Sequence, residues 1–215
     1  MSGDLNKLNT NCLFETDNEY GFPEVSTSAN FSCEDLIPFN TCKKRRAENM
    51  TKGVHFFLDD YKFERIWTKP TDYILLFQDY GNILSPTFSI WSNQPYALNL
   101  FNVYRSRWIT RFFQEYNINV LVDARWSDEK SYDYCFSGIR KNSPVIVNTV
   151  GTHQLENRRM FQRGFEEMLN RIEPSDLYVY GEYMPVEFEK YFDSVTYYES
   201  FWKKQRDRIA ESKEV

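Results

Sequence analysis

From Gly53 onward, short apolar runs alternate with longer segments of helical pattern, and this alternation limits the fold more than any other feature of the sequence. Each run has roughly four to six residues, mostly Val, Ile, Leu, Tyr and Phe, with little alternation of apolar and polar residues. Strands that are apolar on both faces are typical of a parallel sheet covered by helices. The runs are Val54–Leu58, Asn82–Leu84, Ile118–Val122, Val145–Val150, Leu177–Tyr180 and Val195–Tyr198.

The segments between these runs carry the start and stop signals of helices. Pro95 suits the first turn of a long helix over residues 94–116. A second helix, over residues 155–172, has its apolar side chains on one face and ends before Pro174. The acidic start at 127–129 predicts a shorter helix as well, closed by Gly138, because carboxylates are favourable near a helix N-terminus.

About six strand–helix units in this order predict an α/β domain with a mostly parallel sheet. A complete eight-fold barrel usually needs ~250 residues, so the chain fits either an incomplete barrel or an open doubly wound sheet. The expected α/β domain spans residues 53–200. An irregular N-terminal arm over 1–52, which lacks periodicity, precedes it, and a charged helix or tail over 201–215 follows it.

The overall charge and the cysteines narrow the class of protein. A net charge of −5 argues against a protein that coats nucleic acid through its bulk charge. The longest uncharged stretch, residues 81–104, is interrupted by polar residues and does not predict a membrane span. The N-terminus lacks the pattern of a secretion signal, and the four cysteines form no C-x-x-C pair, so we expect reduced thiols and a cytoplasmic location.

The expected ends of the strands concentrate the ionisable residues. Ligands of parallel α/β folds bind beyond the carboxyl ends of the strands. Four carboxylates at these ends are candidates for a divalent metal site or an acid–base pair: Asp59, Asp123, Glu182 and Glu199. Strand alternation places Asp59 and Asp60 on opposite sides, so we expect Asp59 in a site and Asp60 as the cap of the next helix.

One loop between a strand and a helix has the composition of an anion site. Gly151 and Thr152 precede the 155–172 helix, whose first N–H groups are suited to a phosphate, with Arg125 as a possible neighbour. His153 in the same loop is the candidate general base, whereas His55 lies within an apolar run and is expected to be a hydrogen-bonded core residue. No G-x-S-x-G, H-E-x-x-H, P-loop or G-x-G-x-x-G motif is present.

Two groups of basic residues are candidates for binding a partner. The first is the run Lys43, Lys44, Arg45 and Arg46. The second is the pair Arg107 and Arg111, which lie four positions apart on the 94–116 helix and so share a face. The competing interpretation is that these helix arginines extend to solvent or pair with acidic side chains.

Five motifs in order carry a family resemblance: VHFFLDDYKFERIW, LSPTFSIW, NVYRSRW, YCFSGI and VYGE. Over roughly residues 36–183 the chain resembles a domain-of-unknown-function family of bacteria and their phages, number 4417. The resemblance implies a mobile-element or prophage origin and a bacterial host cell. It implies no activity, cofactor or catalytic residue.

Two functional hypotheses follow. The first is an enzyme acting on a phosphorylated or nucleotide-related substrate at the carboxyl ends of the strands, in a pocket lined by Asp59, Asp123, Arg125, His153 and Glu182. The second is a non-catalytic phage factor that binds a host protein or nucleic acid through the arm, the basic run and the arginine helix.

Overall fold

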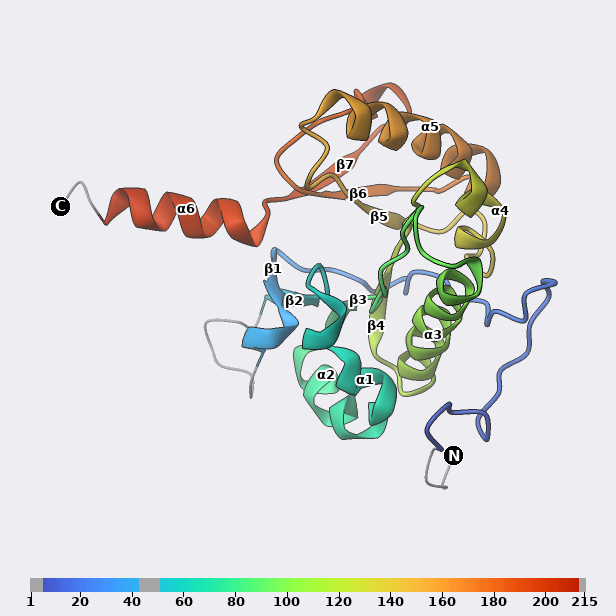
Figure 1. Ribbon diagram of the computed structural model, residues 1–215. Coiled ribbons are helices and arrows are strands. Elements are labelled where there is room, and N and C mark those ends of the chain that lie inside the picture. The colour runs from blue at the N-terminus through green and yellow to red at the C-terminus, as the bar shows by residue number, and fades with distance from the viewer. Residues whose placement is uncertain (1–5, 43–50, 213–215) are drawn as a thin grey trace.

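A seven-stranded, all-parallel sheet forms the centre of the computed structural model, which describes residues 6–42 and 51–212 (Figure 1). Each strand pairs with the next one along the chain. The strands are β1 (Asp35–Pro38), β2 (Lys52–His55), β3 (Asn82–Leu84), β4 (Asn119–Asp123), β5 (Val145–Asn148), β6 (Leu177–Tyr180) and β7 (Val195–Tyr198).

Helices between the strands cover the outside of the sheet, whereas α6 follows β7 and extends away from it (Figure 1). The α-helices are α1 (Glu64–Thr68), α2 (Ile74–Tyr80), α3 (Tyr96–Glu115), α4 (Tyr132–Cys135), α5 (Leu155–Ile172) and α6 (Phe201–Glu211). Short 3-10 helices are η1 (Phe39–Thr41), η3 (Asp60–Lys62), η4 (Pro70–Tyr73), η5 (Glu129–Ser131) and η6 (Phe188–Lys190). Within the described ranges, no helix is long and apolar enough to cross a membrane.

The predicted α/β class and parallel sheet are confirmed. The bounds of β3, β6, β7 and α5 are those expected from the sequence, and α3 lies within the expected 94–116. The expected helix that begins at 127–129 and ends at Gly138 is shorter than predicted, because η5 and α4 together span 129–135.

The N-terminal segment was wrongly expected to be irregular throughout, because it contains β1. This strand pairs residue for residue with β2, from Asp35 opposite Lys52 to Pro38 opposite His55. Only two of its four residues, Leu36 and Ile37, are aliphatic, so no periodic signal marks it. The strand forms because its partner supplies the hydrogen bonds, which local sequence does not encode.

The sheet curls into a nearly closed barrel. Its strand order follows the chain order, whereas a doubly wound sheet reverses direction at a switch point. Side chains from six of the seven strands meet in one buried interior cluster: Leu36, Leu84, Leu121, Ile146, Tyr180 and Tyr198. Across the remaining gap, the Tyr198 hydroxyl of β7 donates to the Cys33 carbonyl, just before β1, at 3.0 Å.

The free edge of β1 explains why the barrel does not close by a further ladder of hydrogen bonds. The Leu36 N–H donates to the Asp35 carboxylate at 2.7 Å. Pro38 has no N–H to donate. An edge with so few available donors resists pairing with another strand.

Candidate functional site

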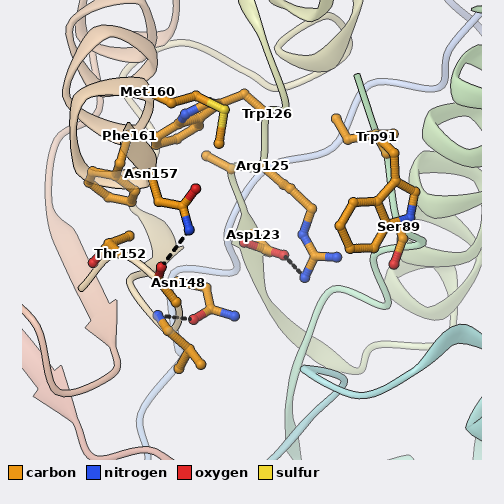
Figure 2. A pocket seen from close by; sticks show the side chains of 14 residues that line it. Ser89, Trp91, Asp123, Arg125, Trp126, Asn148, Thr152, Asn157, Met160 and Phe161 are labelled. Atoms are coloured by element: carbon orange, nitrogen blue, oxygen red, sulfur yellow. Dashed lines mark hydrogen bonds and ion pairs between the residues drawn. The ribbon is translucent and has the colours of Figure 1, made fainter. Parts of the chain in front are cut away.

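A pocket of about 330 Å³ opens at the carboxyl ends of β4 and β5. Three chain segments build its walls: the β3–α3 loop, the residues that follow β4, and the β5–α5 loop with the first turns of α5 (Figure 2). Its polar side chains include Ser89, Asp123, Arg125, Asn148, Thr152 and Asn157, and its large apolar ones are Trp91, Trp126, Met160 and Phe161.

Asp123, the last residue of β4, is the most unusual side chain of the pocket. It is 1% exposed, and in the described chain no well-placed hydrogen-bond donor serves either of its carboxylate oxygens. The nearby Thr87 hydroxyl is bonded instead to the Ser85 carbonyl, at 3.1 Å. The charged contact of Asp123 is Arg125, whose Nη2 lies 3.3 Å from Oδ2. Burial raises the pKa of Asp123 above its usual range, and the charges of Arg125 and Arg107 oppose this shift.

Arg125 joins the buried carboxyl to the open pocket. Its Nη1 donates to the Thr87 carbonyl at 3.2 Å, which fixes the guanidinium beside Asp123. The side chain keeps 23% of its surface exposed, so some of its donors face the pocket (Figure 2). A guanidinium in this position favours a carboxylate or phosphate ligand.

Hydrogen bonds within the β5–α5 loop and to the start of α5 fix the conformation of the loop. Gly151 has φ +88°, in the region that favours glycine, and the space where a Cβ would lie is empty. Its carbonyl accepts a bond from Asn157 Nδ2 at 2.9 Å, and the Thr152 hydroxyl donates to the Thr149 carbonyl at 2.8 Å. The loop therefore presents a fixed backbone to the pocket at the start of α5.

The β3–α3 loop, residues 85–95, is fastened to α3 by buried polar side chains. Asn99 forms two hydrogen bonds with the backbone of Trp91, at 3.1 and 2.9 Å. Asn102 donates to the Ser89 carbonyl, and the Ser106 hydroxyl accepts from the Phe88 N–H. Spacings of three, four and seven positions put these three α3 side chains on one face of the helix. This explains why α3 buries polar residues toward the loop.

Comparison with known proteins shows to which family the chain belongs. The family described as domain of unknown function, DUF4417, matches residues 14–199. The chain belongs to this family. It is similar to the Gene 1 protein of Mycobacterium phage D29, with 30% identity over 212 residues, which are 98% of this chain and 78% of that protein. The Gene 1 protein of Mycobacterium phage L5 is 32% identical over 206 residues, which are 95% of this chain and 89% of that protein. No solved structure matches the chain significantly.

The resemblance predicted from the motifs is therefore confirmed, and the match extends beyond residues 36–183 at both ends. The relatives place this DUF4417 chain among phage proteins.

The two adjacent aspartates of the DUF4417 chain lie outside the pocket. Asp59 has a side chain that is 64% exposed and paired with Lys62 at 2.7 Å. Asp60 caps no helix; its carboxylate accepts bonds from the N–H and the hydroxyl of Ser89, at 3.1 and 2.9 Å. The strand-alternation argument failed because β2 stops pairing at His55, so alternation no longer orients the residues that follow.

The four expected carboxylates do not converge. Glu182 accepts bonds from the Ser200 hydroxyl at 2.6 Å and Arg206 at 2.5 Å, so it secures α6 instead of lining the pocket. Glu199 pairs with Lys203 on the surface. Over the described residues, no group of three or more His, Cys, Asp and Glu is arranged to hold a metal ion. A carboxylate cage for a divalent metal, as expected from the strand ends, is not formed there.

The two histidines have different surroundings. His55 is 1% exposed, and its Nδ1 accepts from the Phe57 N–H at 3.2 Å, which confirms the predicted core histidine. Burial lowers the pKa of His55 to about 3. His153 is exposed and lies against the ring of Tyr183, outside the residues that line the pocket.

Arg107, a candidate for binding a partner, lies inside the protein and not on its surface. It is 3% exposed, and its guanidinium donates to the carbonyls of Ser137 at 3.1 Å and Cys135 at 2.6 Å. Burial lowers the pKa of Arg107 to about 10. Arg111 is partly exposed and pairs with Glu115, as the competing interpretation expected. The basic run Lys43, Lys44, Arg45 and Arg46 lies outside the described residues.

Of the expected site residues, the structure brings together Asp123, Arg125, Gly151 and Thr152. Sequence reasoning missed the aromatic residues on both sides of the pocket, Trp91 and Trp126, together with the amides Asn148 and Asn157. Asn148 lies inside the predicted run Val145–Val150, so the strand-end argument did not select it, whereas in the structure it is the last residue of β5. Trp91 lies in a loop that local sequence does not place in space.

Proposed function

We propose that this chain is an enzyme acting on a phosphorylated or nucleotide-related substrate in the pocket at the ends of β4 and β5. The observation that carries the proposal is the buried carboxyl of Asp123, whose oxygens accept no well-placed hydrogen bond within the described residues and whose charged contact is Arg125, 3.3 Å away. A buried polar group without a partner is costly, and such groups concentrate at functional sites. A ligand that brings a donor to Asp123 would remove this cost.

Different residues of the pocket would bind the phosphate and transfer the proton. Arg125 and the backbone of the Gly151–Thr152 loop supply positive charge and N–H groups for a phosphate. Asp123 serves as the proton donor or acceptor, because it lines the pocket beside Arg125 and burial raises its pKa above the usual range. Substrate binding and proton transfer then depend on different residues.

The test measures binding and turnover separately. Calorimetric titration with inorganic phosphate and with nucleoside mono-, di- and triphosphates is paired with an assay of product formation by chromatography. Arg125→Gln is expected to weaken binding by about 10-fold or more, because a charge-assisted contact is lost. Asp123→Asn keeps the shape of the side chain and is expected to bind while turning over at least about 100-fold more slowly.

Arg111→Gln is the matched control, because Arg111 lies on α3 away from the pocket and pairs with Glu115. Its binding and turnover are expected to equal those of the unaltered protein. Failure of the unaltered, folded protein to bind any of these compounds would contradict the proposal. So would unchanged binding by Arg125→Gln.

The second hypothesis, a non-catalytic factor that binds a host protein or nucleic acid, loses one of its supports because Arg107 is buried. Its remaining basis is the N-terminal arm, the run 43–46 and Arg111, whereas the pocket brings four of the expected site residues together.

A further inference from the structure

Trp91 stands out among the tryptophans that line the pocket. Its side chain is 59% exposed, whereas Trp126 on the opposite wall is half-buried. Figure 2 shows the Trp91 indole on one side of the pocket, with Arg125 extending between it and Asp123. The indole therefore forms an exposed aromatic wall next to the two charged groups of the site.

Although Trp91 is exposed, hydrogen bonds from buried side chains fix its backbone. Both its N–H and its carbonyl are bonded to Asn99, a side chain that is only 5% exposed. Two residues before it, Ser89 is held by Asp60 from one side and by Asn102 from the other. Its neighbour Ile90 is 7% exposed and anchors the loop in the core.

The Trp91 indole projects from this fixed stretch of backbone, which presents it for stacking. A rigid aromatic side chain loses little conformational freedom when a ligand covers it, so more of the contact energy appears as affinity. The opposite wall is formed by Trp126, Met160 and Phe161 (Figure 2). The pocket between these walls has a volume of about 330 Å³, and Asp123 and Arg125 also line it.

We propose that Trp91 is a stacking platform for the nucleobase of a nucleotide, whose polar groups meet Asp123 and Arg125. This inference rests on the proposed function and specifies its substrate class. A sugar phosphate would engage Arg125 and leave the indole uncovered. A nucleotide covers the indole and brings ring nitrogens and exocyclic groups to the buried carboxyl.

The test compares ligands that differ only in the base. The four 5′-nucleoside monophosphates and ribose 5-phosphate are titrated by calorimetry against the unaltered protein, Trp91→Ala and Trp91→Phe. We expect the unaltered protein to prefer the tightest-binding nucleotide over ribose 5-phosphate by about 10-fold, a typical gain from stacking one base. Trp91→Ala removes that preference and leaves ribose 5-phosphate binding unchanged, and Trp91→Phe retains part of it.

Trp202→Ala is the matched control, because Trp202 is 63% exposed but belongs to α6, away from the pocket. It is expected to keep the full preference. If Trp91→Ala, with an unchanged melting temperature, still prefers the nucleotide, stacking on Trp91 is wrong. If the unaltered protein binds ribose 5-phosphate as tightly as every nucleotide, the substrate class is wrong while the phosphate site stands. If it binds none of these compounds, the proposed function itself fails.

Discussion

Among single residues, the neighbours Asp59 and Asp60 illustrate how the surroundings of a side chain decide its role. The Asp59 side chain is mostly exposed and pairs with Lys62. Asp60 bonds to Ser89 and so ties the turn after β2 to the loop that carries Trp91. Two identical residues, adjacent in sequence, therefore differ in what they stabilise.

We expect Asp60→Ala to lower the free energy of unfolding by about 1.5–3 kcal/mol, because hydrogen bonds to a charged group are lost and the Ser89 N–H is left without its acceptor. Urea unfolding followed by circular dichroism measures this change. Asp59→Ala is the control, expected to stay within about 0.5 kcal/mol, since exposed ion pairs contribute little. Equal effects of the two substitutions would contradict the role assigned to Asp60.

His55 predicts a dependence of stability on pH. Burial lowers its pKa from 6.5 to about 3, so the folded state binds fewer protons than the unfolded state between these values. Two charged groups also act on this pKa: Lys204 of α6 disfavours the proton, and Asp35 of β1 favours it. The stability is thus fully present above the unfolded-state pKa and falls as the pH drops toward 3.

The expected loss from His55 between pH 7 and pH 5 is about 2 kcal/mol, at roughly 1.36 kcal/mol per pH unit below an unfolded pKa of about 6.5. In His55→Asn, which can still accept the Phe57 N–H, this part of the pH dependence is expected to vanish. Urea unfolding at both pH values measures it. His153→Asn, at an exposed position, is expected to keep the dependence of the unaltered protein. A His55→Asn protein that still loses the full amount would show that another group is responsible.

Among the helices, α5 carries a glycine, Gly164, at the point where Trp126 of the pocket wall packs against it. A Cβ at Gly164 would lie 2.1 Å from Nε1 of Trp126, whose ring packs over the helix at this point. The absence of a side chain at position 164 is therefore what allows Trp126 to form the pocket wall.

Two effects of Gly164→Ala oppose each other. Alanine favours a helix over glycine by about 1 kcal/mol, whereas forcing an atom into a packed site costs about 1–3 kcal/mol. Because three indole atoms lie within 2.5 Å of the new Cβ, we expect the clash to dominate and the protein to be destabilised by about 1–2 kcal/mol. Thermal unfolding measures the change, and Asn170→Ala, at an exposed position of α5, is expected to be neutral or slightly stabilising. A more stable Gly164→Ala protein would contradict this packing.

In the molecule as a whole, the barrel is completed by side chains where the backbone ladder ends. Tyr198 is 4% exposed and bonds across the gap to Cys33, and Lys204 of α6 pairs with Asp35 of β1. These contacts, and not a strand ladder, hold β7 against β1.

Tyr198→Phe is expected to lower the free energy of unfolding by about 1 kcal/mol through the lost hydrogen bond. The amides of β7 and β1 are expected to exchange hydrogen faster, while those of β3 and β4 in the centre of the sheet keep their protection. Tyr197→Phe, whose ring is 42% exposed, is the neighbouring control and should leave the exchange of both edge strands unchanged. Identical exchange in the two variants would mean that the gap is closed by other contacts.

Local patterns in the chain were enough to predict the α/β class, the parallel sheet, the bounds of α5 and four residues of the pocket. Apolar periodicity and polar strand ends are properties of neighbouring positions, so a single sequence displays them. The same patterns failed for Asp59 and Glu182, because the end of a strand does not say which way the following side chains turn.

Three features became visible only in the folded chain: the curl of the sheet, the strand β1 that begins at Asp35, and the place of Trp91 beside the charged groups of the pocket. Each depends on residues far apart in the chain, through the β1–β2 ladder, the Tyr198–Cys33 bond and the Asn99–Trp91 pair. Local sequence carries no signal for such contacts, because each of them forms only when the surrounding structure brings its two partners together.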